Sequence, residues 1–223
     1  MMTNLFSSFD PSTSNNLSMN WTSSVMFLTM MPITFWVLKT RPMIIIDTLF
    51  KNINKEFSSI LMNKNTSSTM IFISMFLIIM MNNTMGLFPY IFTSTSHMAM
   101  TLALALPMWL SFNLYGWVNK TNHMMQHMVP AGTPSALMPF MVCIETISNL
   151  IRPGTLAIRL AANMIAGHLL LTLLGNTGIF LNNIMLMSML TIQVALITLE
   201  AAVSLIQAYV FSVLTTLYSN EIN

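Results

Sequence analysis

The sequence predicts an all-α multi-pass membrane protein that forms a single membrane domain over residues 1–223. Charged residues make up 6% of the chain and hydrophobic residues 55%, whereas a typical soluble domain is about a quarter charged. A soluble domain of this length would need a charged surface that this chain cannot supply. The net charge of +2 is small and scattered, so no nucleic-acid partner is expected.

The expected order of elements is one or more steep N-terminal spans, an interfacial amphipathic helix, two further spans and a hairpin of two long inclined helices. Residues 1–20 are polar and rich in turn-forming residues, and they predict a surface tail. Residues 21–38 carry no charge and are just long enough to cross a hydrocarbon layer of about 30 Å.

Residues 39–64 differ from the rest because they hold five of the eight basic residues of the chain. Apolar residues recur here at helical spacing, so we expect an amphipathic helix that lies in the membrane interface. Basic residues favour the cytoplasmic or matrix side of a membrane. The N-terminus is therefore expected on the opposite side.

Residues 65–119 carry no charged side chain, and this interval predicts two spans at 67–91 and 98–118. A polar, turn-rich segment separates the two spans. His97 lies in this segment and is expected at the surface.

Residues 119–135 are polar and are broken by Pro and Gly, which predicts a loop. His123 and His127 in this loop have no third ligand nearby, so neither a metal nor a cofactor is expected. The single cysteine, Cys143, follows in an apolar run and is expected to be a small core residue.

Residues 136–218 are apolar for more than eighty positions, with one weak break. They predict two unusually long helices, 136–174 and 179–218, each about 60 Å long. That length is about twice the hydrocarbon thickness. Either Pro153 and Gly154 divide the first helix into two spans, or both helices are strongly inclined.

Each long helix carries a line of polar residues on an otherwise apolar surface, because residues three or four apart share a helix face. The first line is formed by Glu145, Ser148, Arg152, Thr155, Arg159 and Asn163, and the second by Gln193, Glu200, Ser204 and Gln207. His168 lies nine residues after Arg159, which is half a turn around the helix, so it is expected to face elsewhere.

Arg159 is the residue of this pattern that most requires an explanation. An arginine in the middle of a membrane costs from about 3 to more than 10 kcal/mol, and the nearest helix end lies many residues away. A functional role is therefore favoured over extension of the side chain to the headgroups. Asn163, Gln193 and Gln207 are candidate polar partners for it.

The other ionisable residues of the two helices allow more than one interpretation. Glu145 and Glu200 could each pair with an arginine or carry a proton. Arg152 adjoins the Pro-Gly pair and is interpreted as structural. His168 could line a separate aqueous path or make a packing contact.

Several segments carry a resemblance to a known family: "PFMVCIETISNLIRPG" with "LAIRLAANMIAGHLLL", "LEAAVSLIQAYVFSVLTTLY" and "NNTMGLFPYIFTSTSH". Together they resemble the subunit a family of F-type ATP synthases in its animal mitochondrial form, over nearly the whole chain. The resemblance implies a non-catalytic stator subunit that offers two offset proton half-channels to a rotating c-ring. The other partners it implies are the peripheral stalk, further membrane-sector subunits, lipid and protons, in the mitochondrial inner membrane.

The resemblance also implies roles for particular residues. The essential arginine of the family falls on Arg159, which is expected to act as the gate between the half-channels. The remaining positions of the proton path fall on Asn163, Glu145, His168, Glu200 and Gln207. A fixed cation favours the ionised form of the ring carboxylate and repels a proton that crosses directly.

Two other classes of function remain as alternatives. One is a secondary transporter or a proton-pump subunit of a respiratory complex, although transporters commonly contain paired repeats and no internal repeat is found here. The other is a purely structural membrane subunit, in which Arg159 could be replaced without loss of activity.

Overall fold

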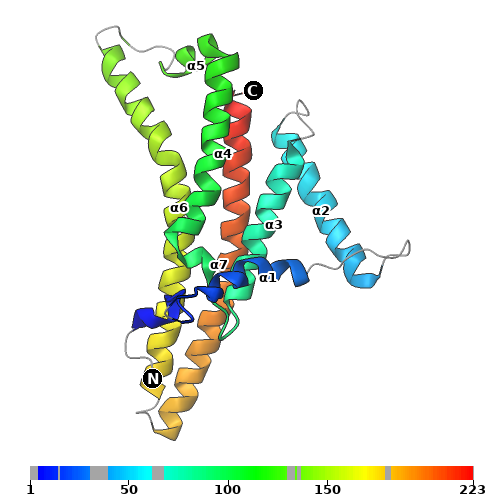
Figure 1. The fold of residues 1–223 in the computed structure, drawn as a ribbon, viewed down its shortest axis with the longest axis vertical. Helices are drawn as coiled ribbons and strands as arrows, with labels where there is room; N and C mark the ends of the chain where they lie inside the picture. The colour runs from blue at the N-terminus through cyan, green and yellow to red at the C-terminus, as the bar shows by residue number, and fades with distance from the viewer. Residues whose placement is uncertain are drawn as a thin grey trace.

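The computed structural model describes residues 5–14, 16–30, 40–61, 68–129, 134, 137–178 and 182–222 (Figure 1). The helices are α1 (Ser23–Met30), α2 (Arg41–Ile60), α3 (Thr69–Gly86), α4 (Met98–Asn119), α5 (Thr121–His127), α6 (Met138–Thr177) and α7 (Asn183–Ile222). Short 3-10 helices are η1 (Leu5–Phe9), η2 (Met19–Thr22) and η3 (Ser94–Ser96). No β-strand occurs among these described residues, and the predicted all-α fold class is confirmed.

Four helices, α3, α4, α6 and α7, are long and apolar enough to cross a membrane. They correspond to the spans predicted at 67–91 and 98–118 and to the long helices predicted at 136–174 and 179–218. Successive members of this set run in opposite directions (Figure 1). The chain is therefore arranged as a multi-pass bundle.

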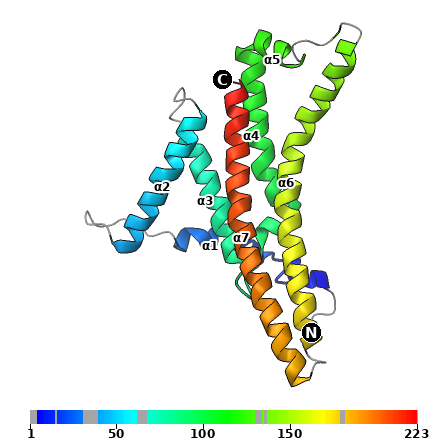
Figure 2. The ribbon, with the colours of Figure 1, turned by 180° about the vertical axis from the view of Figure 1, so that it is seen from behind.

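The span predicted at 21–38 is described only in its first half. There, α1 runs across the bundle helices and not along them (Figure 1, Figure 2). Residues 31–39 lie outside the described residues, so a span in this region stays a prediction.

α6 is one continuous helix of 40 residues, so Pro153 and Gly154 do not divide it. Proline lacks the N–H that would bond to the carbonyl four residues earlier, and such a break is tolerated where neighbouring helices cover it. Pro153 is buried in the bundle, which meets this condition. α6 and α7 form an antiparallel hairpin (Figure 2), and inclination remains as the explanation of their length.

α7 lies at the centre of the bundle, where it contacts α2, α3, α4 and α6. The main core consists of Phe76, Ile79, Ala105, Leu156, Ala157, Leu160, Ala208 and Phe211. Small residues at such positions allow helix backbones to approach closely. Ser204, Ser212 and Thr216 of α7 are also fully buried, and each donates its hydroxyl to a carbonyl three residues earlier. These hydroxyls are therefore satisfied within their own helix.

α2 is amphipathic, as predicted for residues 39–64. Its buried face packs on α3 through Phe57 and Leu61, whereas Lys51 and Lys55 are exposed. The location of α2 at the membrane interface stays a prediction.

The loop predicted at 119–135 and the position of Cys143 differ from the structure. Within the loop predicted at 119–135, residues 121–127 form α5, because the Pro and Gly residues that break helices come only after it. His123 and His127 are exposed on this helix. The prediction that Cys143 lies in the core is wrong: it is exposed, because the first turns of α6 extend away from the bundle (Figure 1).

Candidate functional site

Arg159 lies midway along α6 with its side chain exposed. The bundle side of the same stretch is formed by the buried residues Leu156, Ala157, Leu160 and Ala161. Within the described part of the chain, Arg159 makes no hydrogen bond or ion pair, and in particular none to Asn163, Gln193 or Gln207. The cation therefore faces outward without a partner from its own chain.

The surface around Arg159 is apolar apart from the line of polar residues on its own helix. Thr155 and Asn163, one turn away on either side, are exposed, and the neighbouring Ile158 is 50% exposed. An arginine on an apolar membrane surface requires a counter-charge or polar groups nearby. This face of the hairpin is thus suited to an apolar partner that carries an acidic group.

A pocket of about 230 Å³ opens between α6 and α7, beyond Arg159 toward the C-terminal end of α6. Asn163 and His168 of α6 line it together with Glu200 of α7. Nε2 of His168 and Oε1 of Glu200 are buried there and have no hydrogen-bond partner among the described residues. A pocket of this size with such groups has room for several water molecules.

Gly167 is the reason that Glu200 can lie in this pocket. A Cβ atom at position 167 would lie 2.7 Å from Glu200 Oε1 and 2.8 Å from its Cδ. The carboxylate of Glu200 therefore rests directly on the backbone of α6, next to His168. The sequence predicted Glu200 and His168 as functional residues but gave no signal for Gly167.

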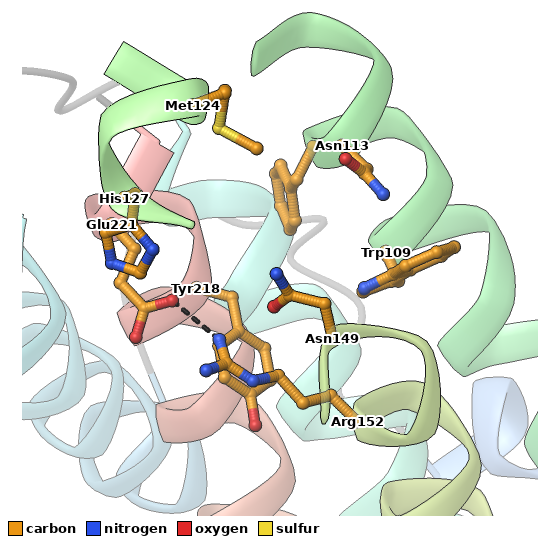
Figure 3. A pocket seen from close by; sticks show the side chains of 9 residues that line it. Trp109, Asn113, Met124, His127, Asn149, Arg152, Tyr218 and Glu221 are labelled. Carbon is orange, nitrogen blue, oxygen red and sulfur yellow. Dashed lines mark hydrogen bonds and ion pairs between the residues drawn. The ribbon is translucent and has the colours of Figure 1, made fainter. Parts of the chain in front are cut away.

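A second polar cluster lies on the other side of Arg159, where α6 meets the end of α7 (Figure 3). Arg152 Nη1 donates a hydrogen bond to Glu221 Oε2 at 2.8 Å, and its Nη2 lies 3.6 Å from Glu145 Oε1. The guanidinium carbon also lies 5.2 Å from the centre of the Tyr218 ring, within the range of a cation–π contact. Arg152 thus joins the two long helices.

A small cavity of about 50 Å³ adjoins this cluster. Its walls come from α4, α5, α6 and α7, and they include Trp109, Asn113, Met124, His127 and Asn149 (Figure 3). The cavity has polar groups on several sides and is large enough for a few water molecules.

The two clusters lie at different heights along α6. Glu145 precedes Arg159 by about 21 Å and His168 follows it by about 14 Å, at 1.5 Å per residue. Because Glu200 is level with Gly167 in an antiparallel pair, Gln207 is level with the turn of α6 that carries Arg159. Gln207 is half-buried there.

Residues 17–220 match the family described as ATP synthase A chain. The chain belongs to this family. Proteins named ATP synthase subunit a from Drosophila mauritiana, Anopheles quadrimaculatus and Locusta migratoria are similar to it, with 60%, 61% and 59% identity over 224, 226 and 224 residues. In each case 100% of both chains is covered.

The sequence allowed Glu145 to pair with an arginine, as it does with Arg152, but the two partners of Arg152 on α7 were not predicted. Tyr218 and Glu221 lie 66 and 69 residues later in the sequence, and only the antiparallel packing of α6 and α7 brings them to Arg152. The polar character of the C-terminal turn, "LYSNE", was the one available signal.

Proposed function

We propose that this chain is the non-catalytic stator subunit through which protons reach and leave the c-ring of a rotary ATP synthase. The observation that carries the proposal is Arg159, an exposed and unpaired cation on an apolar face. It lies between two polar clusters that open at different heights of one helix hairpin. A purely structural subunit gives no reason for a cation in this place.

Arg159 acts as the gate of the proton path. Its guanidinium stays protonated in an apolar site, so it favours the ionised form of a ring carboxylate that passes it. The same charge repels a proton that moves straight from one cluster to the other. Each proton that crosses 100 mV releases about 2.3 kcal/mol. Because a proton cannot cross directly, this energy drives rotation of the ring.

The two clusters serve as the half-channels. Asn163, His168 and Glu200 form one relay around the pocket between α6 and α7, and Glu145 belongs to the other. Gln207 is the late polar position of the path, on α7 at the level of the turn that carries Arg159. Bound water connects these groups to the two sides of the membrane.

The proposed location is the mitochondrial inner membrane, with the N-terminus on the intermembrane-space side. The end of α2, helix α5 and the C-terminus lie together at one end of the bundle, and the N-terminal segment lies toward the other (Figure 1). The basic segment around α2 favours the matrix for the first end. The pocket with His168 and Glu200 then opens toward the intermembrane space. The peripheral stalk and other membrane-sector subunits are the remaining partners.

Cysteine cross-linking tests which face of α6 meets the ring. In a Cys143→Ser background, Ile158→Cys is expected to cross-link to a cysteine placed on the outer helix of a c subunit. Ala161→Cys lies on the same helix but is buried (2% exposed), so it serves as the matched control. Cross-linking from position 161 and none from position 158 would contradict the proposed ring face.

A further inference from the structure

Within the predicted surface tail, the described residues 5–14 and 16–20 form a folded segment. The backbone N–H and the hydroxyl of Ser12 both donate to Asp10 Oδ1, at 3.0 and 2.8 Å, and these bonds hold the pKa of Asp10 below its usual value. Asn20 Nδ2 donates to the Asp10 carbonyl at 3.2 Å. Hydrogen bonds from its own side chains therefore stabilise the fold of the segment that contains η1 and η2.

His97 fastens this segment to the turn between α3 and α4. Its Nε2 lies 2.9 Å from the carbonyl oxygen of Phe9, and because a carbonyl only accepts, Nε2 must carry the hydrogen. The imidazole packs against both Phe92 and Trp21, with ring centres 5.2 and 5.3 Å away, and these two rings also contact each other. His97, expected at the surface, is half-buried, and its contacts with Phe9 and Trp21 come from far away in the sequence.

The ring of Phe9 meets the ring of His168. The two ring centres lie 6.3 Å apart and the planes are inclined by 85°, which is an edge-to-face contact. η1 as a whole packs against α6. His168 has no hydrogen bond to any described residue, and its Nε2 is buried. Packing is therefore what sets the orientation of this imidazole.

The orientation of the His168 ring determines whether its buried Nε2 faces the pocket between α6 and α7. The pocket between α6 and α7 also holds Glu200, whose buried Oε1 is likewise unpartnered in the described chain. Glu200 is the other titratable group that lines this pocket. A relay between the two groups requires that Nε2 stays directed into the shared space, within reach of one water molecule.

We propose that Phe9, held by His97, is a positioning residue that keeps the His168 imidazole directed into the pocket shared with Glu200. The N-terminal segment is then a working part of the half-channel and not a tail. This inference rests on the proposed function, because positioning of His168 matters only if His168 carries protons.

A double-mutant cycle in the assembled ATP synthase tests the inference. ATP-driven proton pumping, normalised to the amount of assembled complex, is measured for Phe9→Ala, His168→Gln and the double variant. Phe9→Ala is expected to lower pumping by about two- to tenfold, as the usual strength of an aromatic pair implies. In the His168→Gln background, Phe9→Ala should have no further effect, because coupled residues are not additive. An equal loss in both backgrounds overturns the inference.

Two more comparisons keep the inference testable if His168→Gln abolishes pumping. Phe9→Tyr keeps an aromatic ring and should rescue most of the pumping lost in Phe9→Ala, whereas Phe9→Leu should not. Equal pumping in the Tyr and Leu variants overturns the inference. Phe6→Ala is the matched control, because Phe6 is on the same short helix and 67% exposed. Full pumping by His168→Gln alone would instead refute the relay role of His168 in the proposed function.

Discussion

At the residue scale, Gly167, which has no side chain, shapes the pocket as much as the ionisable groups do. Glu200 reaches the space beside His168 only because Gly167 leaves the α6 backbone open. The polar line of α7 was enough to predict Glu200 from the sequence. Gly167 could not be predicted in the same way, since its role depends on which residue of α7 lies opposite.

Gly167→Ala is expected to lower ATP-driven proton pumping several-fold while the complex still assembles. The new methyl group would lie 2.7 Å from Glu200 Oε1, so the carboxylate must move out of its place. Gly154→Ala is the control, because a Cβ at position 154 meets nothing within 4 Å and both changes add the same helix propensity. Equal pumping by the two variants, measured in membrane vesicles, would contradict this role of Gly167.

At the element scale, the α6–α7 hairpin is fastened near one end by Arg152. Its bond to Glu221 and its contact with Tyr218 join α6 to α7, whereas Glu145 holds the guanidinium from α6 itself. These side chains are partly exposed, with 27% for Arg152 and 42% for Glu221. Ion pairs of this kind contribute about 0.2–1 kcal/mol, so Arg152 adds to the stability of the hairpin without determining it.

Arg152→Gln is therefore expected to lower the thermal stability of the detergent-solubilised complex slightly and to leave substantial proton pumping. The thermal stability of Arg152→Lys should lie between those of the unmodified complex and Arg152→Gln. Lysine keeps the charge but loses the planar, bidentate guanidinium. The measurement is a thermal melt of the purified complex together with a pumping assay. Complete loss of pumping in a normally assembled Arg152→Gln complex would show that Arg152 belongs to the proton path, against its interpretation as structural.

The sequence predicted most of the elements because their signals are local. Uncharged runs predicted the long helices, and spacing by three and four predicted a polar line on α6 that includes Arg159, whose side chain is exposed in the structure. Contacts between distant segments were not predictable. The bond from His97 to Phe9 spans 88 residues, and no periodic pattern within one helix can show which distant backbone lies beside it.

At the scale of the whole molecule, the core depends on small residues where α4, α6 and α7 meet. Ala105, Ala157 and Ala208 are each exposed by 3% or less. Close approach of these helices leaves no room for a larger side chain, and overpacking of a core costs about 1–3 kcal/mol.

Ala105→Leu is expected to reduce the amount of assembled complex markedly. Ala103→Leu, two residues earlier on α4 but on its exposed side, should have little effect on assembly. Native gel electrophoresis of membranes that carry each variant measures the difference. Equal assembly of the two would mean that the bundle is not packed closely at Ala105.

The whole arrangement places one unpaired cation, Arg159, on an apolar face between two separate polar clusters. The most direct test of this account is Arg159→Gln in assembled membranes, with ATP-driven proton pumping and passive proton leak recorded together. We expect pumping to disappear while the complex still assembles, and the leak to rise because the barrier between the half-channels is gone. Pumping that survives in Arg159→Gln would contradict the account, since Arg159 would then be a structural residue.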